Sequence, residues 1–120
     1  YEHHVGLSRK TMLEQYHMCD MLVFASTYEG FGLPIIESNA VGRPVVAGNC
    51  WSLPEVAKDA ACLVDPYDVG DIRKGIARVI NDSDYRENMI RQGFENVKRF
   101  RVDSMAEKYA ELYRSIYQSV

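Results

Sequence analysis

The sequence predicts an α/β domain, in which a parallel sheet of three or four strands is flanked by helices. Three observations support this class: short apolar runs of strand length, helical patterns between them, and consecutive helical patterns towards the end. Uninterrupted apolar runs are typical of strands that helices cover on both faces. The alternation of strands and helices favours right-handed crossovers and therefore parallel strands.

Strands are expected at residues 21–25, 44–47 and 61–64, where each apolar run is followed by turn-forming or polar residues. The weaker apolar segment at residues 5–7 is the candidate for a fourth strand. A doubly wound nucleotide-binding domain commonly has about six strands. We therefore expect the second half of such a domain, followed by terminal helices.

The first helix is expected to begin after Ser8, a residue type that commonly caps helices, and to stop near Asp20. Its apolar side is formed by Met12, Leu13 and Tyr16. A second, short helix is expected from Pro34, because proline suits a first helical turn. This helix runs through residue 40, and the glycine at 42 suits its exit. Another short helix is expected to open at Pro54.

Three helices are expected after residue 66, capped in turn by Asp68, Ser83 and Asp103. Each has apolar residues at helical spacing, and the second also contains an interior glycine, Gly93. The apolar positions are Val69, Ile72, Ile76, Val79 and Ile80, then Met89, Ile90, Phe94 and Val97, and finally Met105, Tyr109, Leu112 and Ile116.

Composition limits the classes of function. The 120 residues are 47% hydrophobic, enough for one domain, and the net charge of −3 provides no general attraction to nucleic acid or anionic lipid. Three cysteines without paired spacing predict reduced thiols in a cytoplasmic protein. No apolar stretch approaches the roughly 20 residues of a membrane span. Because the sequence starts without Met, we expect a piece of a longer chain.

The segment from residue 26 to 33 follows the first expected strand and has the composition of a binding loop. Ligands of open parallel sheets gather beyond the carboxyl ends of the strands. Gly30 and Gly32 lack a Cβ, so a ligand can approach the main chain there. The helix that starts at Pro34 should also turn its first N–H groups towards the same crevice. This arrangement favours a phosphate or sugar oxygens.

Two glutamates, Glu29 and Glu37, accompany this loop. Carboxylates repel phosphate but accept hydrogen bonds from hydroxyl groups, so each can hold a pair of hydroxyls with the helix amides between them. A nucleotide sugar has this order of groups. The spacing alone is equally compatible with a plain turn, in which the acidic residue complements the helix dipole.

The segment EGFGLPIIE at residues 29–37 resembles the Glu-x7-Glu motif of retaining GT-B glycosyltransferases, most closely the group-1 family, also called family 4. The resemblance covers about residues 5–100. Three further blocks are similar and come in the family's order: CDMLVFAS at 19–26, GRPVVA at 42–47, and LPEV at 53–56 with LVDP at 63–66.

The resemblance implies the donor-binding, Rossmann-like half of an enzyme that transfers a sugar from a nucleotide diphosphate sugar to an acceptor hydroxyl with retention. It implies no cofactor and no metal. Glu37 is expected to hold the ribose hydroxyls, and Glu29 to hold hydroxyls of the transferred sugar and to stabilise charge near the anomeric carbon. Gly30 is expected to permit the bend. The backbone amides expected to contact the sugar and phosphates are those of Phe31, Gly32 and Leu33.

Residues 1–120 are expected to be part of the C-terminal domain of such an enzyme. The family's basic clamp for the diphosphate, its base-covering loop and its N-terminal domain lie upstream of this sequence. The 120 residues alone are therefore expected to transfer no sugar. Lys58 stands where many relatives have glycine, and we expect it to affect only a surface turn.

The expected partners are the donor, a glycan or lipid-linked acceptor and the N-terminal domain, in polysaccharide or glycoconjugate synthesis in the cytoplasm. Contact with the inner membrane face and oligomerisation remain open. The alternative is a non-catalytic nucleotide-sugar-binding or assembly module on the same fold. A dehydrogenase is disfavoured because no Gly-x-Gly-x-x-Gly follows a first strand.

Several other residues have structural interpretations. The basic residues at 98–101 suit a helix C-terminus better than a lipid headgroup. Trp51 and Glu55 flank a turn that approaches the nucleotide in the resembling family. Metal binding is not expected of the histidines, because their spacing is unsuitable; they are His3, His4 and His17. The last helix has tyrosines at four-residue spacing, a packing stripe for the other domain or a second copy, formed by Tyr109, Tyr113 and Tyr117.

Overall fold

A parallel sheet of three strands, in the order β1-β2-β3, lies at the centre of the computed structural model, which describes residues 4–118. The strands are β1 (Leu22–Phe24), β2 (Val45–Gly48) and β3 (Cys62–Val64). Leu22 pairs with Val45, and Val46 pairs with Cys62. The three stronger sequence predictions for strands are therefore confirmed.

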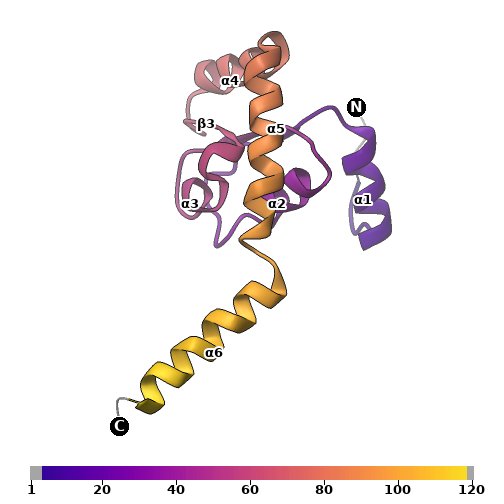
Figure 1. The fold of residues 1–120 in the computed structure, drawn as a ribbon. Helices are drawn as coiled ribbons and strands as arrows, with labels where there is room; N and C mark the ends of the chain where they lie inside the picture. The colour runs from indigo at the N-terminus through magenta and orange to yellow at the C-terminus, as the bar shows by residue number, and fades with distance from the viewer. Residues whose placement is uncertain (1–3, 119–120) are drawn as a thin grey trace.

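Helices surround the sheet, and one long helix projects away from it (Figure 1). The helical segments are α1 (Arg9–Met18), α2 (Leu33–Ala40), α3 (Leu53–Ala57), the 3-10 turn η1 (Lys58–Ala60), α4 (Val69–Asn81), α5 (Ser83–Lys98) and α6 (Val102–Gln118). The α/β class and the consecutive helices at the end are as predicted.

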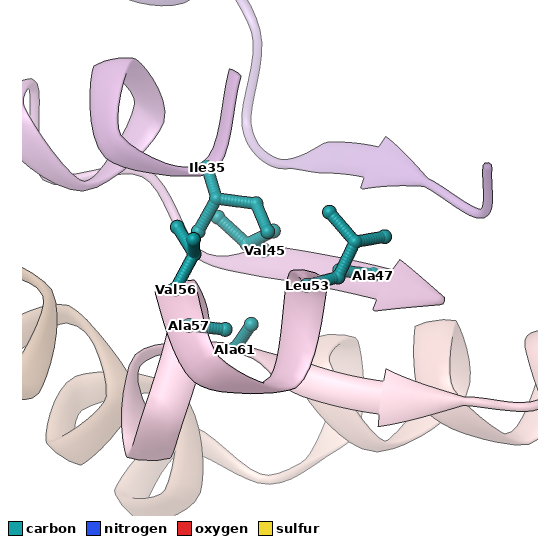
Figure 2. Close-up of a cluster of buried hydrophobic side chains, with 7 residues drawn as sticks. All are labelled: Ile35, Val45, Ala47, Leu53, Val56, Ala57 and Ala61. Atoms are coloured by element: carbon teal, nitrogen blue, oxygen red, sulfur yellow. The ribbon is translucent and has the colours of Figure 1, made fainter. Parts of the chain in front are cut away.

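The central strand β2 is buried along its whole length, and its side chains alternate between two apolar clusters. Val45 and Ala47 face α2 and α3, where the cluster is completed by Ile35, Leu53 and neighbours (Figure 2). On the other face Val46 packs with Val79 of α4 and Met89 of α5. Burying one such side chain contributes about 1.5–3 kcal/mol. Both faces are covered, as the uninterrupted apolar runs predicted.

Two buried asparagines join α5 to α2, α3 and η1. Asn96 of α5 donates to the side-chain oxygen of Asn39 in α2 and to the carbonyl of Val56, and Asn39 donates to the carbonyl of Ala60. Gly93 makes this contact possible, because a Cβ there would lie 3.0–3.3 Å from the Asn39 side chain. The interior glycine of α5 therefore lets the Asn39 side chain pack closely against this helix.

Two predicted caps are confirmed and two are corrected. Ser8 and Asp68 cap α1 and α4 by accepting backbone hydrogen bonds. The cap of α5 is Asp82, which accepts from the backbone N of Tyr85 at 2.9 Å, so Ser83 is the first helical residue. A carboxylate at this position also interacts with the helix dipole, which a serine does not. Helix α6 starts at Val102, which places Asp103 inside its first turn.

The fourth strand does not form. Residues 5–7 have no strand structure, Val5 is 81% exposed, and Gly6 has a φ of +65°, in the left-handed region that suits a turn. A strand needs a neighbour to pair with, and three residues of apolar character do not ensure one.

Helix α6 buries none of its residues. Its predicted apolar stripe is present but exposed, with Tyr109 56% and Tyr117 87% accessible, and the rings of Tyr109 and Tyr113 stack at 6.5 Å. The projecting helix gives the molecule its long dimension of 57 Å, against 30 and 28 Å across.

Candidate functional site

The residues 26–32, called the motif loop below, leave the carboxyl end of β1. The loops after β2 and β3 leave the same edge, because the three strands are parallel. The motif loop then enters α2 directly at Leu33. The predicted position of the loop, beyond the carboxyl ends of the strands and at a helix N-terminus, is confirmed.

The loop after β2 holds the motif loop in place. The hydroxyl of Ser52 lies 3.1 Å from the carbonyl oxygen of Glu29 and 3.0 Å from that of Phe31. The indole nitrogen of Trp51 donates to the carbonyl of Thr27 at 3.0 Å. Sequence reasoning did not identify Ser52, because its partners lie more than twenty positions earlier in the chain.

Trp51 adopts an unusual backbone conformation at this junction, with a φ of +53°. Such strain costs about 1–3 kcal/mol for a residue other than glycine and persists only where the surroundings hold it. Here the hydrogen bond to Thr27 and an edge-on contact with the Tyr28 ring, 4.9 Å between centroids, hold the side chain. Trp51 therefore lies beside the motif loop, whereas Glu55 is exposed on α3.

Gly32 is the glycine whose conformation the loop requires. It caps α2 with a φ of +105°, and a Cβ there would lie 2.7 Å from the Leu53 side chain. Gly30 has no positive φ, and a Cβ there would meet nothing within 4 Å. The bend predicted at Gly30 therefore falls at Gly32, and the main chain at Gly30 faces open space.

The first turn of α2 offers fewer amides than the sequence suggested. Pro34 has no N–H, and the amide of Ile35 donates to the carbonyl of Gly32 at 3.0 Å. The backbone amides of Phe31, Gly32 and Leu33 precede Pro34 in the sequence. They remain the predicted hydrogen-bond donors to a ligand.

Glu29 is partly exposed, and its carboxylate accepts a hydrogen bond from the hydroxyl of Ser26 at 3.0 Å. The Ser26 hydroxyl also lies 3.1 Å from the carbonyl of Tyr28. A carboxylate has about four lone-pair sites. One contact with Ser26 orients the group and leaves capacity for hydroxyl groups of a ligand.

Glu37 lies on α2 and is also oriented by a hydroxyl group. The phenol of Tyr16, on α1, donates to its Oε2 at 2.9 Å. Burial, and then the hydrogen bond with Glu37, raise the pKa of Tyr16 above its usual range, so the phenol stays a donor. The sequence carried no signal for this pair, because the two residues are twenty-one positions apart on different helices.

A cavity of about 520 Å³ lies between α1 and α2, and Glu37 lines it. Its walls are largely apolar, with Arg9 and Tyr16 also contributing. Leu33, the first residue of α2 after the motif loop, also lines the cavity. Glu29 is not among the lining residues: it lies in the motif loop before α2, whereas Glu37 lies within that helix, so the two glutamates do not share a single cavity.

The basic residues after α5 make local contacts. The Arg99 guanidinium donates to the side chain of Asn96 and to the carbonyl of Glu55, and Lys98 pairs with Glu95 at 2.7 Å. Arg101 lies 3.6 Å from Asp103. These contacts support the structural interpretation of the segment. His3, one of the histidines considered for metal binding, lies outside the described residues.

Comparison with protein families matches residues 2–96 to the family described as "Glycosyl transferases group 1". This chain belongs to the group 1 glycosyltransferase family. The match includes the motif loop, both glutamates and all three strands, and it ends before α6. The resemblance to group-1 glycosyltransferases, inferred from four sequence blocks, is thereby confirmed.

Individual proteins agree with the group 1 assignment. The O-antigen chain mannosyltransferase B of Escherichia coli is 39% identical over 92 residues, which cover 77% of this chain and 24% of that protein. The chain thus spans about a quarter of the length of this relative. Other relatives of this chain include further mannosyltransferases.

Solved structures have the same fold as this group 1 chain. Sucrose-phosphate synthase from Thermosynechococcus elongatus has a TM-score of 0.78 at 26% identity, over 95% of this chain and 29% of that one. The C-terminal domain of a group 1 glycosyl transferase from Francisella tularensis has a TM-score of 0.71 at 27% identity, over 84% and 53% of the two chains. Within residues 4–118, no helix has the length and apolar character needed to cross a membrane.

Proposed function

We propose that these residues form the donor-binding part of a retaining glycosyltransferase, which moves a sugar from a nucleotide diphosphate sugar to an acceptor hydroxyl. The observation that carries the proposal is the pair Glu29 and Glu37. Each carboxylate is oriented by one protein hydroxyl, and the two flank the N-terminal turn of α2. This is the arrangement that a polyol on both sides of a diphosphate requires.

The cavity beside Glu37 has the size and lining of a nucleoside site. Binding sites for small molecules are commonly about 300–1,000 Å³ and mostly apolar, with a few polar groups that fix orientation. We assign the base to the apolar walls and the ribose hydroxyls to Glu37. The apolar walls are formed by Met12, Leu13, Leu33, Ala40 and Val41.

Glu29 is assigned to the transferred sugar. Its carboxylate would accept the sugar hydroxyls and stabilise positive charge that develops near the anomeric carbon. The diphosphate would lie between the glutamates, near the main chain of residues 30–33 and the positive end of the α2 dipole. Gly30 suits this approach, because no protein atom lies where its Cβ would be.

The site is half of a cleft. Glu29 lies outside the cavity that Glu37 lines, and the motif loop contains no basic residue that could bind the diphosphate. The chain also spans only a quarter of its mannosyltransferase relative. We therefore assign residues 1–120 to part of a C-terminal domain, in a longer protein that supplies the basic clamp, the acceptor groups and the second wall.

The reaction as proposed needs no metal or cofactor, because electrostatic stabilisation of the departing diphosphate supplies most of the rate enhancement. The proposed acceptor is a growing glycan or a lipid-linked glycan, in a cytoplasmic enzyme that works in polysaccharide or glycoconjugate synthesis. The name of the E. coli relative, an O-antigen chain mannosyltransferase, supports this class of product.

Titration of the complete parent protein with nucleoside diphosphates and nucleotide sugars tests the assignment. Glu37→Ala should weaken both kinds of ligand about tenfold or more, because the hydroxyls lose a charged acceptor. Glu29→Ala should weaken nucleotide sugars more than nucleoside diphosphates and should lower kcat. Glu87→Ala, which changes an exposed glutamate on α5, is the matched control.

Two results would contradict the proposal. Unchanged binding in both glutamate variants would favour a non-catalytic assembly module. Sugar transfer by the isolated 120 residues, measured as product from a labelled donor, would contradict the assignment to an incomplete site.

A further inference from the structure

We propose that Tyr16 is a positioning residue for donor binding, whose hydroxyl holds the Glu37 carboxylate in the orientation that receives the ribose hydroxyls. The inference rests on the proposed function, because it takes Glu37 as the ribose-binding group. It extends the site to a helix that the Glu-x7-Glu motif does not include.

The contact between the two side chains is direct and asymmetric. The Tyr16 phenol donates to Oε2 of Glu37 at 2.9 Å. Tyr16 is only 8% exposed and is the buried residue of α1, whereas Glu37 is exposed and lines the cavity. A buried group therefore holds one oxygen of a solvent-facing carboxylate.

The backbone around Tyr16 is held by Arg43, which follows the C-terminal end of α2. The Arg43 guanidinium donates to the carbonyl of Tyr16 at 3.1 Å and to that of His17 at 2.6 Å. The backbone N of Arg43 in turn donates to the carbonyl of Ser38 in α2 at 3.0 Å. Arg43 thus links the end of α1 to α2 and fixes the spacing at which the phenol meets Glu37.

The consequence for binding is preorganisation. An exposed glutamate samples several rotamers, and a ligand that needs one of them must meet the entropic cost of ordering it. The phenol restricts the carboxylate before the ligand arrives and uses one of about four lone-pair sites. The remaining sites suffice for the two hydroxyls of a cis-diol.

The phenol is suited to this task over a wide pH range. Burial raises the pKa of Tyr16, and the neighbouring Glu37 raises it further. A neutral phenol donates to a carboxylate, whereas a phenolate would repel it. The hydroxyl therefore stays in its donor form at neutral and moderately alkaline pH.

The affinities of the complete parent protein for ribonucleotides and for 2′,3′-dideoxyribonucleotides distinguish a positioning role of Tyr16 from a packing role. The probe is whichever of UDP, GDP and ADP binds the wild type most tightly, together with its 2′,3′-dideoxy form. Tyr16→Phe keeps the buried ring and removes only the hydroxyl. We expect it to weaken the ribonucleotide about three- to tenfold and to leave the dideoxy form unchanged. Tyr85→Phe is the matched control, because Tyr85 is a partly buried tyrosine on the opposite face of the sheet.

A double-mutant cycle completes the test. In a Glu37→Ala background, Tyr16→Phe should have no further effect on ribonucleotide binding, because the group that it positions is gone. Equal weakening of both nucleotides by Tyr16→Phe, or additive effects in the cycle, would overturn the inference. So would discrimination between the nucleotides that depends on Glu37 but not on Tyr16, which would leave the proposed function intact. If neither variant alters the preference for the ribonucleotide, the proposed function itself fails.

Discussion

The sheet with its flanking helices and the projecting helix α6 have equally clear apolar patterns in sequence, but only the former buries them. Val45, Val46 and Ala47 of β2 are fully buried, whereas the seventeen residues of α6 include no buried side chain. An apolar stripe therefore predicts what a segment can pack against. It does not establish that the partner lies within the same residues.

The difference also concerns what stabilises each region. Isolated helices of about 12–15 residues are marginal in water, and most helical stability in proteins comes from packing. Helix α6 is only slightly longer, and within residues 4–118 nothing covers its stripe. That the stripe packs on another domain of the parent protein, or on a second copy, stays a prediction.

The largest expected effect comes from truncating matched leucines in the two regions. Leu53→Ala removes a fully buried side chain of the cluster in Figure 2 and should lower the free energy of unfolding by about 2–5 kcal/mol. Leu112→Ala, at a position that is 52% exposed on α6, should change it by less than about 0.5 kcal/mol. Urea denaturation of the 120-residue chain, followed by tryptophan fluorescence, measures both. Equal losses would mean that α6 is packed in solution.

An intermediate effect on stability is expected at one of two glycines, Gly75, and none at the other, Gly30. A Cβ on Gly75 of α4 would lie 2.6 Å from Cγ1 of Val64 and 3.3 Å from Cγ1 of Val46. Gly75→Ala should therefore destabilise the fold by about 1–3 kcal/mol through overpacking. Gly30→Ala meets open space in the motif loop and should leave thermal stability nearly unchanged, while it weakens nucleotide-sugar binding in the parent protein. Full binding by Gly30→Ala would contradict the approach of a ligand to this segment of main chain.

The smallest effect on the sheet region is expected from deleting α6. A chain that ends at Arg101 should unfold in urea at nearly the same midpoint as the full 120 residues, because the helix covers no core residue. Sedimentation velocity should also detect less self-association, since the exposed stripe is removed. A large fall in the midpoint would show that α6 supports the sheet, and the contrast between the two regions would be wrong.

Local signals were the most reliable part of the sequence analysis. Ser8 and Asp68 cap their helices as predicted, because a cap depends on only a few neighbouring residues. The predictions for Ser83 and Asp103 were each displaced by one or two positions. At the first of these, the preceding aspartate, Asp82, competes for the same role and is the stronger cap.

Predictions that needed a distant partner were less complete. The motif loop and both glutamates could be placed, because strand ends and helix starts follow from the order of elements. The two hydroxyl groups that orient the glutamates differ in how far along the chain they lie. Ser26 is three residues from Glu29, so this pair could be predicted from the sequence, whereas Tyr16 contacts Glu37 from another helix. The fourth strand at residues 5–7 failed for the same reason, since pairing is a tertiary property.

The sequence by itself determined the α/β class, the family and the two acidic residues of the candidate site, because periodicity, turn residues and motif spacing are written along the chain. Only the tertiary structure decided that Tyr16 holds Glu37, that Ser52 and Trp51 hold the motif loop, and that α6 is left uncovered. These features depend on which helices and loops are neighbours in the folded molecule. The arrangement of neighbours is determined by burial of the whole apolar core and not by any local stretch of residues.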